Sequence, residues 1–278
     1  MIRTTRQLKD LVRNMAKGNG PRTQIIMRNY VMERFLERLS LSSYRDQLIL
    51  KGGMLVSAIV GLDTRSTMDI DATFKETQLT EESSRKAVED ITSIPLEDGM
   101  TFHVNSVSPI MDESDYIGIR VMMTATLERM RIPLKIDFST GDVITPNEVE
   151  YSFKVLFEER TISILAYNLE TILAEKLETL FARGTANSRM RDFYDLFVIG
   201  NMQTYDHAVF KDAFANTVEK RGSATVIQSM DLILDEVENS HEMITFWSGY
   251  QRKFEYAANI AWSEVMQGIR GLCDIFKA

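Results

Sequence analysis

Apolar residues recur at helical spacing through the first forty positions of the chain. Residues 3–16 place their apolar side chains three and four apart, which predicts a helix with one buried face. Pro21 suits the first turn of a second helix, and the same pattern continues to about Ser40. The apolar positions of the first helix are Leu8, Leu11, Val12 and Met15.

Beyond this point the pattern changes to short apolar runs and to strict alternation, which is typical of strands. Residues 48–50 form a buried run, and in residues 68–74 apolar and more polar side chains alternate. Acids in the first turn predict a short helix from Thr80. Further strands are expected at 101–107, 116–127, 132–138, 149–156 and 161–165, and 117–127 with 132–138 predicts a hairpin linked by 128–131.

From Asn168 onward the helical pattern dominates. Helices are expected at 168–183, 188–199, 206–220, 225–238, 241–258 and 261–276. The sequence therefore predicts an α+β protein with a domain of mixed strands and helices at 1–160, N-terminal helices included, and a helical domain at 161–278.

The composition is that of a globular protein, with 44% hydrophobic and 26% charged residues and only 5 prolines. No apolar run reaches the length that crosses a bilayer, and the first residues lack the apolar core of a secretory signal, so we expect a cytoplasmic protein without a membrane partner. The single cysteine, Cys273, excludes an internal disulfide and a cysteine-based zinc site. The three histidines lie too far apart to show a metal-ligand spacing.

Charge is distributed unevenly along the chain. The net charge is −8, yet residues 1–52 sum to +7 and the remainder to −15. A basic segment on an acidic body could contact a phosphate backbone or an acidic partner. Alternatively, these side chains form a solvated helix face.

The alternating run at 68–74 contains two carboxylates, Asp69 and Asp71, spaced two apart. Residues with this spacing share one face of a strand, so both carboxylates point the same way. Adjacent like charges repel unless a cation bridges them, and a carboxylate pair together with substrate phosphates is a usual way to hold Mg²⁺. The alternative is an ordinary D-x-D on a solvated strand face.

A glycine pair, Gly52 and Gly53, separates the buried strand at 48–50 from a short apolar helix that starts near Met54. Glycines at such a turn allow a ligand to approach the backbone, and the start of a helix attracts phosphate. A plain tight turn is the alternative.

A third carboxylate, Asp137, ends the strand predicted at 132–138. If this strand lies beside residues 68–74, Asp137 can complete a two-metal site or take a proton from an attacking hydroxyl. It could instead begin the turn that follows the strand.

In the helical half, Lys176 lies at the edge of an apolar helix face, and Asp192 opens the next helix. A lysine held between packed helices can present its charge to a triphosphate, with Asp192 fixing its position. Helix capping is the alternative role for Asp192 and Asp195.

Residues 45–200 resemble the AbiEii/AbiGii toxin family, nucleotidyltransferase-like proteins of bacterial toxin–antitoxin and phage-defence systems. The segments that carry the resemblance, in family order, are LKGG at 50–53 with Leu55 downstream, RSTMDID at 65–71, Lys135-Ile136-Asp137, LAEKLETLFAR at 173–183 and RMRDFYDLF at 189–197.

The resemblance implies a mixed-sheet core like that of DNA polymerase β-like nucleotidyltransferases, followed by helices. Asp69 and Asp71 would hold Mg²⁺ or Mn²⁺, with Asp137 as the third carboxylate. Lys176 would contact the NTP, and Asp192 would be needed for activity. Related toxins add nucleotides to tRNA 3′ ends, block translation and are countered by an antitoxin protein.

One position departs from the pattern of the wider superfamily, which has Gly-Ser after its first strand. Here Met54 follows Gly53, so phosphate binding would pass to backbone amides or to Ser57, Ser66 or Thr67. We therefore expect an Mg²⁺-dependent nucleotidyltransferase that acts on RNA, with tRNA as the expected acceptor. The alternatives are a phosphotransferase that modifies a protein such as the antitoxin, and a non-catalytic nucleotide- or RNA-binding module.

Overall fold

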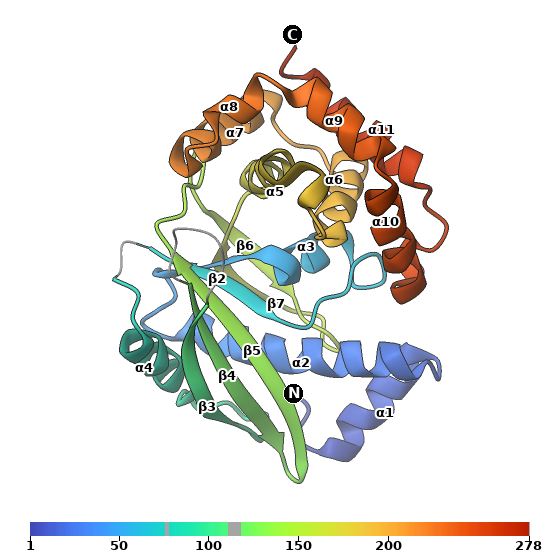
Figure 1. The fold of residues 1–278 in the computed structure, drawn as a ribbon. Coiled ribbons are helices and arrows are strands. Elements are labelled where there is room, and N and C mark those ends of the chain that lie inside the picture. The colour runs from blue at the N-terminus through green and yellow to red at the C-terminus, as the bar shows by residue number, and fades with distance from the viewer. Residues whose placement is uncertain (76–77, 111–117, 278) are drawn as a thin grey trace. The chain divides into compact units, whose positions relative to one another are not determined.

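The computed structural model describes residues 1–75, 78–110 and 118–277 (Figure 1). The chain forms two compact units. The first comprises Met1–Leu62, Ser66–Asp142 and Val149–Ala166, and the second comprises Asp63–Arg65, Val143–Glu148 and Tyr167–Ala278. Each unit is described by itself below, and the predicted boundary at residue 160 stays a prediction.

Across the described residues, the first unit contains one mixed sheet of seven strands in the order β3-β4-β5-β2-β1-β7-β6. β2 runs parallel to β5 and β1 runs parallel to β7, whereas the other neighbours are antiparallel. The strands are β1 (Leu48–Lys51), β2 (Ile70–Phe74), β3 (Met100–Ile110), β4 (Gly118–Leu127), β5 (Met130–Thr140), β6 (Val149–Lys154) and β7 (Thr161–Ala166).

Strict alternation in β4 and β5 gives the sheet one apolar and one polar face. Val121 and Met123 of β4 and Leu134 and Ile136 of β5 are buried, and the residues between them are more exposed. Helices α2 and α4 pack against these strands and against each other, so they cover the apolar face (Figure 1). The helices of this unit are α1 (Thr5–Ala16), α2 (Gly20–Leu41), α3 (Gly52–Val60) and α4 (Glu81–Thr92).

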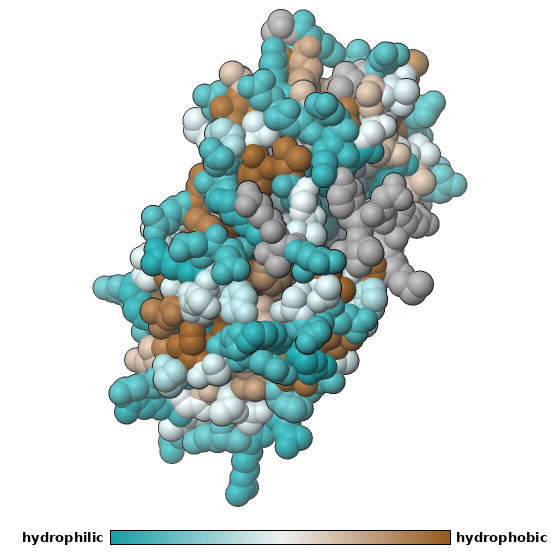
Figure 2. Space-filling model, turned by 90° about the vertical axis from the view of Figure 1, so that its left-hand side faces the viewer, coloured by the Kyte–Doolittle hydropathy of each residue, from teal (hydrophilic) through white to brown (hydrophobic). Residues whose placement is uncertain are grey.

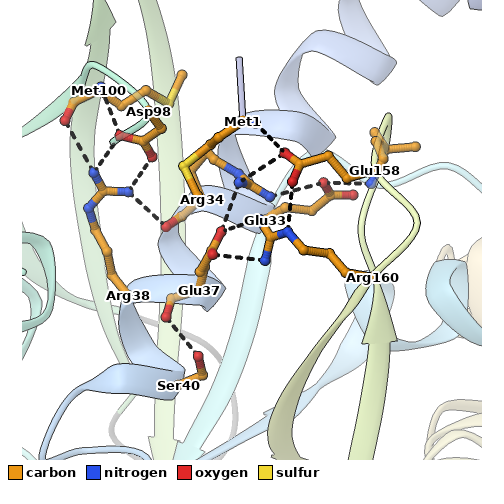
Figure 3. A network of polar contacts seen from close by, with 11 residues as sticks. Met1, Glu33, Arg34, Glu37, Arg38, Ser40, Asp98, Met100, Glu158 and Arg160 are labelled. Carbon is orange, nitrogen blue, oxygen red and sulfur yellow. Dashed lines mark hydrogen bonds and ion pairs between the residues drawn. The ribbon is translucent and has the colours of Figure 1, made fainter. Parts of the chain in front are cut away.

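Helix α2 carries buried charges as well as apolar side chains (Figure 3). Arg34 is fully buried and its Nη1 lies 2.7 Å from Glu37 Oε2. Arg38 donates two hydrogen bonds to the buried carboxylate of Asp98, at 2.7 and 2.9 Å. The charges of Arg34 and Arg38 therefore lie inside the protein. These two side chains neither form a solvated helix face nor reach a phosphate backbone or an acidic partner.

The second unit is helical, with an apolar core between α5, α6, α7 and α11. Asn168 and Asp206 cap the first turns of α5 and α7, because their side chains accept hydrogen bonds from backbone amides there. The helices are α5 (Leu169–Arg183), η1 (Gly184–Ala186), α6 (Met190–Met202), α7 (His207–Arg221), α8 (Ala224–Ile227), α9 (Met230–Asn239), α10 (His241–Lys253), η2 (Glu255–Ala257) and α11 (Trp262–Asp274).

The predicted α+β class is confirmed, and the differences concern the ends of elements and two predicted helices, 225–238 and 241–258, that are each divided. The helix expected at 225–238 is two helices, because Ser229 leaves the helical region with φ −124° and ψ 17°. The β4–β5 turn is shorter than expected, with Glu128 in the left-handed region at φ 53°. The strand start expected at 116–117 lies outside the described residues.

None of the helices in the described part of the chain combines the length and apolar character that a membrane crossing requires. On the face drawn in Figure 2, hydrophilic side chains are spread widely and hydrophobic ones form small groups.

Candidate active site

Strand pairing brings two of the predicted carboxylates together in the first unit. Asp71 lies within β2 and Asp69 lies just before its first residue. In the parallel pairing of β2 with β5, Asp71 is directly opposite Asp137. On its other side Asp71 faces Lys51 at the end of β1. The proposed neighbourhood of residues 68–74 and 132–138 is therefore present.

Two cations to which the sequence analysis assigned no role pair with Asp69 and Asp137. Lys135 Nζ lies 2.9 Å from Asp69 Oδ2 and 3.5 Å from Asp137 Oδ2. Arg120, which faces Asp137 from β4, donates two hydrogen bonds to its carboxylate at 2.8 and 2.7 Å. Arg120 and Lys135 both lie in predicted strands, and the alternation within 132–138 places Lys135 on the same face as Asp137. The sequence does not give the register between strands that pairs each cation with a carboxylate.

The glycine turn lies against Asp71. Gly53 donates its backbone N–H to Asp71 Oδ2 at 3.3 Å. Gly52 has φ +64°, and a Cβ at this position would lie 2.2 Å from the same oxygen. The two glycines thus give Asp71 both space and a hydrogen bond, which goes beyond the role of a plain turn.

The carboxyl of Asp71 is held in an environment that disfavours its charge. Burial raises its pKa above the usual range, and the charges of Asp137 and Asp69 raise it further. The Gly53 amide and the Lys51 ammonium oppose this rise. Because burial and the neighbouring carboxylates disfavour the charged form of Asp71, an additional cation beside it would stabilise that form.

A divalent cation such as Mg²⁺ requires oxygen ligands, and carboxylates are the ligands that these strands offer. Within residues 1–75, 78–110 and 118–277, no three or more His, Cys, Asp or Glu side chains are grouped so that they could hold a metal ion. Asp137 is engaged by Arg120, whereas Asp69 and Asp71 offer carboxylate oxygens of the kind that Mg²⁺ prefers. The residues present therefore fit a cation held by Asp69 and Asp71 in place of the Lys135 ammonium.

A further lysine lies close to this group. Lys51 Nζ is 2.5 Å from Asp142 Oδ2, which also accepts a hydrogen bond from Ser139 Oγ at 2.7 Å. Lys51 belongs to the LKGG segment, but the sequence analysis assigned it no role.

The hydroxyl groups considered for phosphate binding are buried. Ser57, Ser66 and Thr67 are each exposed by 6% or less. Thr67 Oγ1 donates to the backbone oxygen of Asp69 at 3.4 Å, and Asn29 Nδ2 donates to the Thr67 carbonyl at 3.1 Å. Ser66 and Thr67 lie in the segment before β2 and Ser57 lies in α3, and their predicted contact with nucleotide stays a prediction.

In the second unit, Lys176 and Asp192 are paired as expected. Lys176 Nζ lies 2.5 Å from Asp192 Oδ1 and 2.9 Å from Asp195 Oδ2. Burial disfavours the charged lysine, but Asp192 and Asp195 outweigh it and raise the pKa of Lys176 well above its usual value. Lys176 is therefore held in place by two carboxylates that favour its charged form.

Asp195 lies at the centre of this buried cluster, so helix capping does not describe its role. It accepts two hydrogen bonds from Arg65, at 3.0 and 3.1 Å, in addition to the contact with Lys176. Burial alone would raise the pKa of Asp195, but the charges of Arg65 and Lys176 lower it. Because 130 positions separate Arg65 from Asp195, local sequence patterns could not reveal this pair.

Comparison with known proteins identifies the family. Residues 34–267 match the AbiEii family, described as the nucleotidyl transferase AbiEii toxin of type IV toxin–antitoxin systems. The chain belongs to the AbiEii family. The earlier resemblance is thereby confirmed over most of the chain.

Two solved structures share the fold of this AbiEii protein. A proposed nucleotidyltransferase from H. pylori has 16% identity and a TM-score of 0.54, covering 91% of this chain and 95% of that one. JHP933 from Helicobacter pylori has 15% identity and the same TM-score, covering 91% of this chain and 92% of that one. No curated protein matches the chain. The protein is thus a toxin-like nucleotidyltransferase with the fold of these structures.

Proposed function

We propose that this AbiEii protein transfers nucleotides from an NTP to the 3′ end of an RNA, with tRNA as the acceptor, and so inhibits translation in the cytoplasm. The observation that carries the proposal is the apposition of Asp71 to the Gly52–Gly53 turn, beside Asp69 and Asp137. Such a site combines carboxylates for a cation with backbone amides for phosphates. The family also implies an antitoxin protein that neutralises the activity.

In the proposed reaction, the acceptor's 3′ hydroxyl oxygen forms a bond to the α-phosphorus of the NTP. The bond between the α-phosphorus and the bridging oxygen breaks, and pyrophosphate leaves. Asp69 and Asp71 would hold Mg²⁺ or Mn²⁺, which when bound neutralises charge on the phosphates. Asp137 would accept the hydroxyl proton, while Arg120 fixes its orientation.

Backbone amides of the glycine turn and the Lys176 side chain would bind the NTP. The amide of Gly52 would bind phosphate oxygens, since the superfamily serine is replaced by Met54, and the amide of Gly53 would join it once Asp71 turns from this amide to the cation. Lys176 would contact the triphosphate, and Asp192 would hold the lysine in place. Ser66 and Thr67 remain candidates for further nucleotide contacts.

The test is a transfer assay with each labelled NTP, total tRNA and Mg²⁺ or Mn²⁺. We expect label in the RNA with wild-type protein and at least a 100-fold lower rate for Asp69→Asn, which keeps the shape but loses the charge. Asp46→Asn, an exposed aspartate of the same unit, serves as the control and should transfer at the wild-type rate.

Label that enters a protein instead of RNA would favour the phosphotransferase alternative, and intact mass would distinguish a phosphate from a nucleotide adduct. Equal rates for Asp69→Asn and wild type would contradict the assigned site.

A further inference from the structure

One face of strands β3, β4 and β5 is polar and lies opposite the face that α2 and α4 cover. Cross-strand register defines it, because residues directly opposite one another share a face. Starting at Asp137 and Arg120, it continues in steps of two residues towards the β4–β5 turn. The residues of this face, called the open strand face below, are Thr101, His103, Ser106, Ser108, Arg120, Met122, Thr124, Thr126, Arg131, Pro133, Lys135 and Asp137.

The part of the open strand face that is farther from the carboxylates is exposed to solvent. Thr101, His103, Arg131 and Pro133 are exposed, and the β4 residues between them are half-exposed. β3, β4 and β5 are drawn in front of α2 in Figure 1, so this face is turned towards the viewer. The surface therefore begins at the carboxylates and extends away from them.

Charge on these strands departs from that of the whole chain. About one residue in seven of the protein is Asp or Glu, but β3, β4 and β5 together carry a single acid, Asp137. Arg120 already neutralises that carboxylate. Lys135 is paired with Asp69 and Asp137, whereas Arg131 and His103 belong to strands with no other acid, in a protein of net charge −8.

The uncharged side chains of the face are mostly hydrogen-bonding groups. Threonines line β4 and the start of β3, and Asn105 donates to Thr124 Oγ1 at 2.9 Å beside a bulge in β3. Hydroxyl, amide and cationic side chains are the groups that contact phosphate and sugar in nucleic-acid complexes. With Met122 and Pro133 as its apolar members, the face lacks the apolar centre of a typical protein interface.

The length of the face suits an extended ligand. Six positions along β5 separate Asp137 from Arg131, which corresponds to about 20 Å of strand. Lys135 and Arg131 lie along this path, with Lys135 beside Asp69 and Arg131 near the turn.

We propose that the open strand face binds the sugar–phosphate backbone of the RNA acceptor and guides its 3′ end to the carboxylates. This inference rests on the proposed function, because an acceptor bound at Asp137 must continue over a neighbouring surface. Arg131 and His103 are binding residues in this scheme, remote from the reacting atoms and contacting phosphates.

The experiment measures binding of labelled tRNA by fluorescence anisotropy at several salt concentrations. The double variant His103→Glu/Arg131→Glu changes two exposed side chains of the face. Arg85→Glu is the control, an exposed arginine on α4 at the covered face. We expect the double variant to raise the Kd at least tenfold and to reduce the salt slope by about one per lost contact, with Arg85→Glu unchanged.

Steady-state kinetics distinguishes a loss of RNA binding from a loss of catalysis. In the transfer assay the double variant should raise the KM for RNA and leave the kcat and the KM for NTP near their wild-type values. A thermal unfolding midpoint equal to that of wild type checks that the variant is folded.

If wild type transfers label to RNA but the double variant binds RNA as Arg85→Glu does, the inference is overturned and the proposed function stands. If wild type neither binds nor labels RNA, the proposed function fails and the inference fails with it. Loss of binding to an acidic protein, with RNA binding unchanged, would assign the face to a protein partner and also overturn the inference.

Discussion

Gly52 meets two requirements that other residue types do not. Its φ of +64° lies in the left-handed region, and the space where a Cβ would stand is filled by the Asp71 side chain. The glycine therefore determines where the Asp71 carboxylate can lie, although it contributes no side chain itself.

We expect Gly52→Ala to lower kcat/KM for nucleotide transfer about 100-fold, because the new Cβ would displace Asp71. Gly18→Ala is a matched control, since Gly18 has φ +80° but no atom within 4 Å of the added Cβ. It has comparable backbone strain without the clash. Similar transfer rates for the two variants, with similar unfolding midpoints, would show that Asp71 is not constrained by this contact.

Glu33 is a buried acid on α2 with a clear pH signature. It accepts the Leu156 N–H at 2.9 Å, and burial raises its pKa to about 8, opposed by the Leu156 amide and Arg34. Because the folded-state pKa exceeds the unfolded one, the stability that Glu33 contributes is present at low pH and is lost as pH rises through 8.

Wild-type protein should therefore lose on the order of 2 kcal/mol of unfolding free energy from this group between pH 6 and 9. Glu33→Gln cannot ionise and should lose less over the same interval in urea titrations. Glu159→Gln, at an exposed position nearby, should follow wild type. Parallel pH profiles for Glu33→Gln and wild type would contradict the assignment.

At the scale of elements, Asp195 joins α5, α6 and the segment that contains Arg65. Its carboxylate is fully buried and forms ion pairs with both Lys176 and Arg65. Removing one charge from such a cluster leaves a buried cation without its partner, which is more costly than losing a surface ion pair.

Asp195→Asn should lower the free energy of unfolding by about 3 kcal/mol in guanidinium titrations. Asp212→Asn, at an exposed position on α7, should change it by less than about 0.5 kcal/mol. A loss for Asp195→Asn no larger than that of the control would show that the cluster contributes little to stability.

At the scale of the whole molecule, the sequence predicted the types of most elements and the meeting of Asp71 with Asp137. Alternation and helical periodicity are local properties, so they identify strands and helices directly. The partners Arg120 and Lys135 could not be assigned, because a shift of two residues in register would keep the same face and change every pair. Arg65 and Asp195 are joined only by the tertiary fold.

The burial of charged side chains also could not be predicted from the sequence. The arginines of α2 resemble surface residues in the sequence, but Arg34 and Arg38 are inside the first unit with carboxylate partners from distant segments. Periodicity reports which residues share a helix face, and it does not report which polar residues a later segment will cover.

The parallel pairing of β2 and β5 has a consequence for how the protein matures. Asp71 and Asp137 are adjacent in space, yet β3 and β4 lie between them in the chain. Loop closure over such a distance is slow compared with local helix formation. During synthesis, Asp71 therefore cannot face Asp137 until the ribosome has released β5, so the two carboxylates come together only after more than half of the sheet has been made.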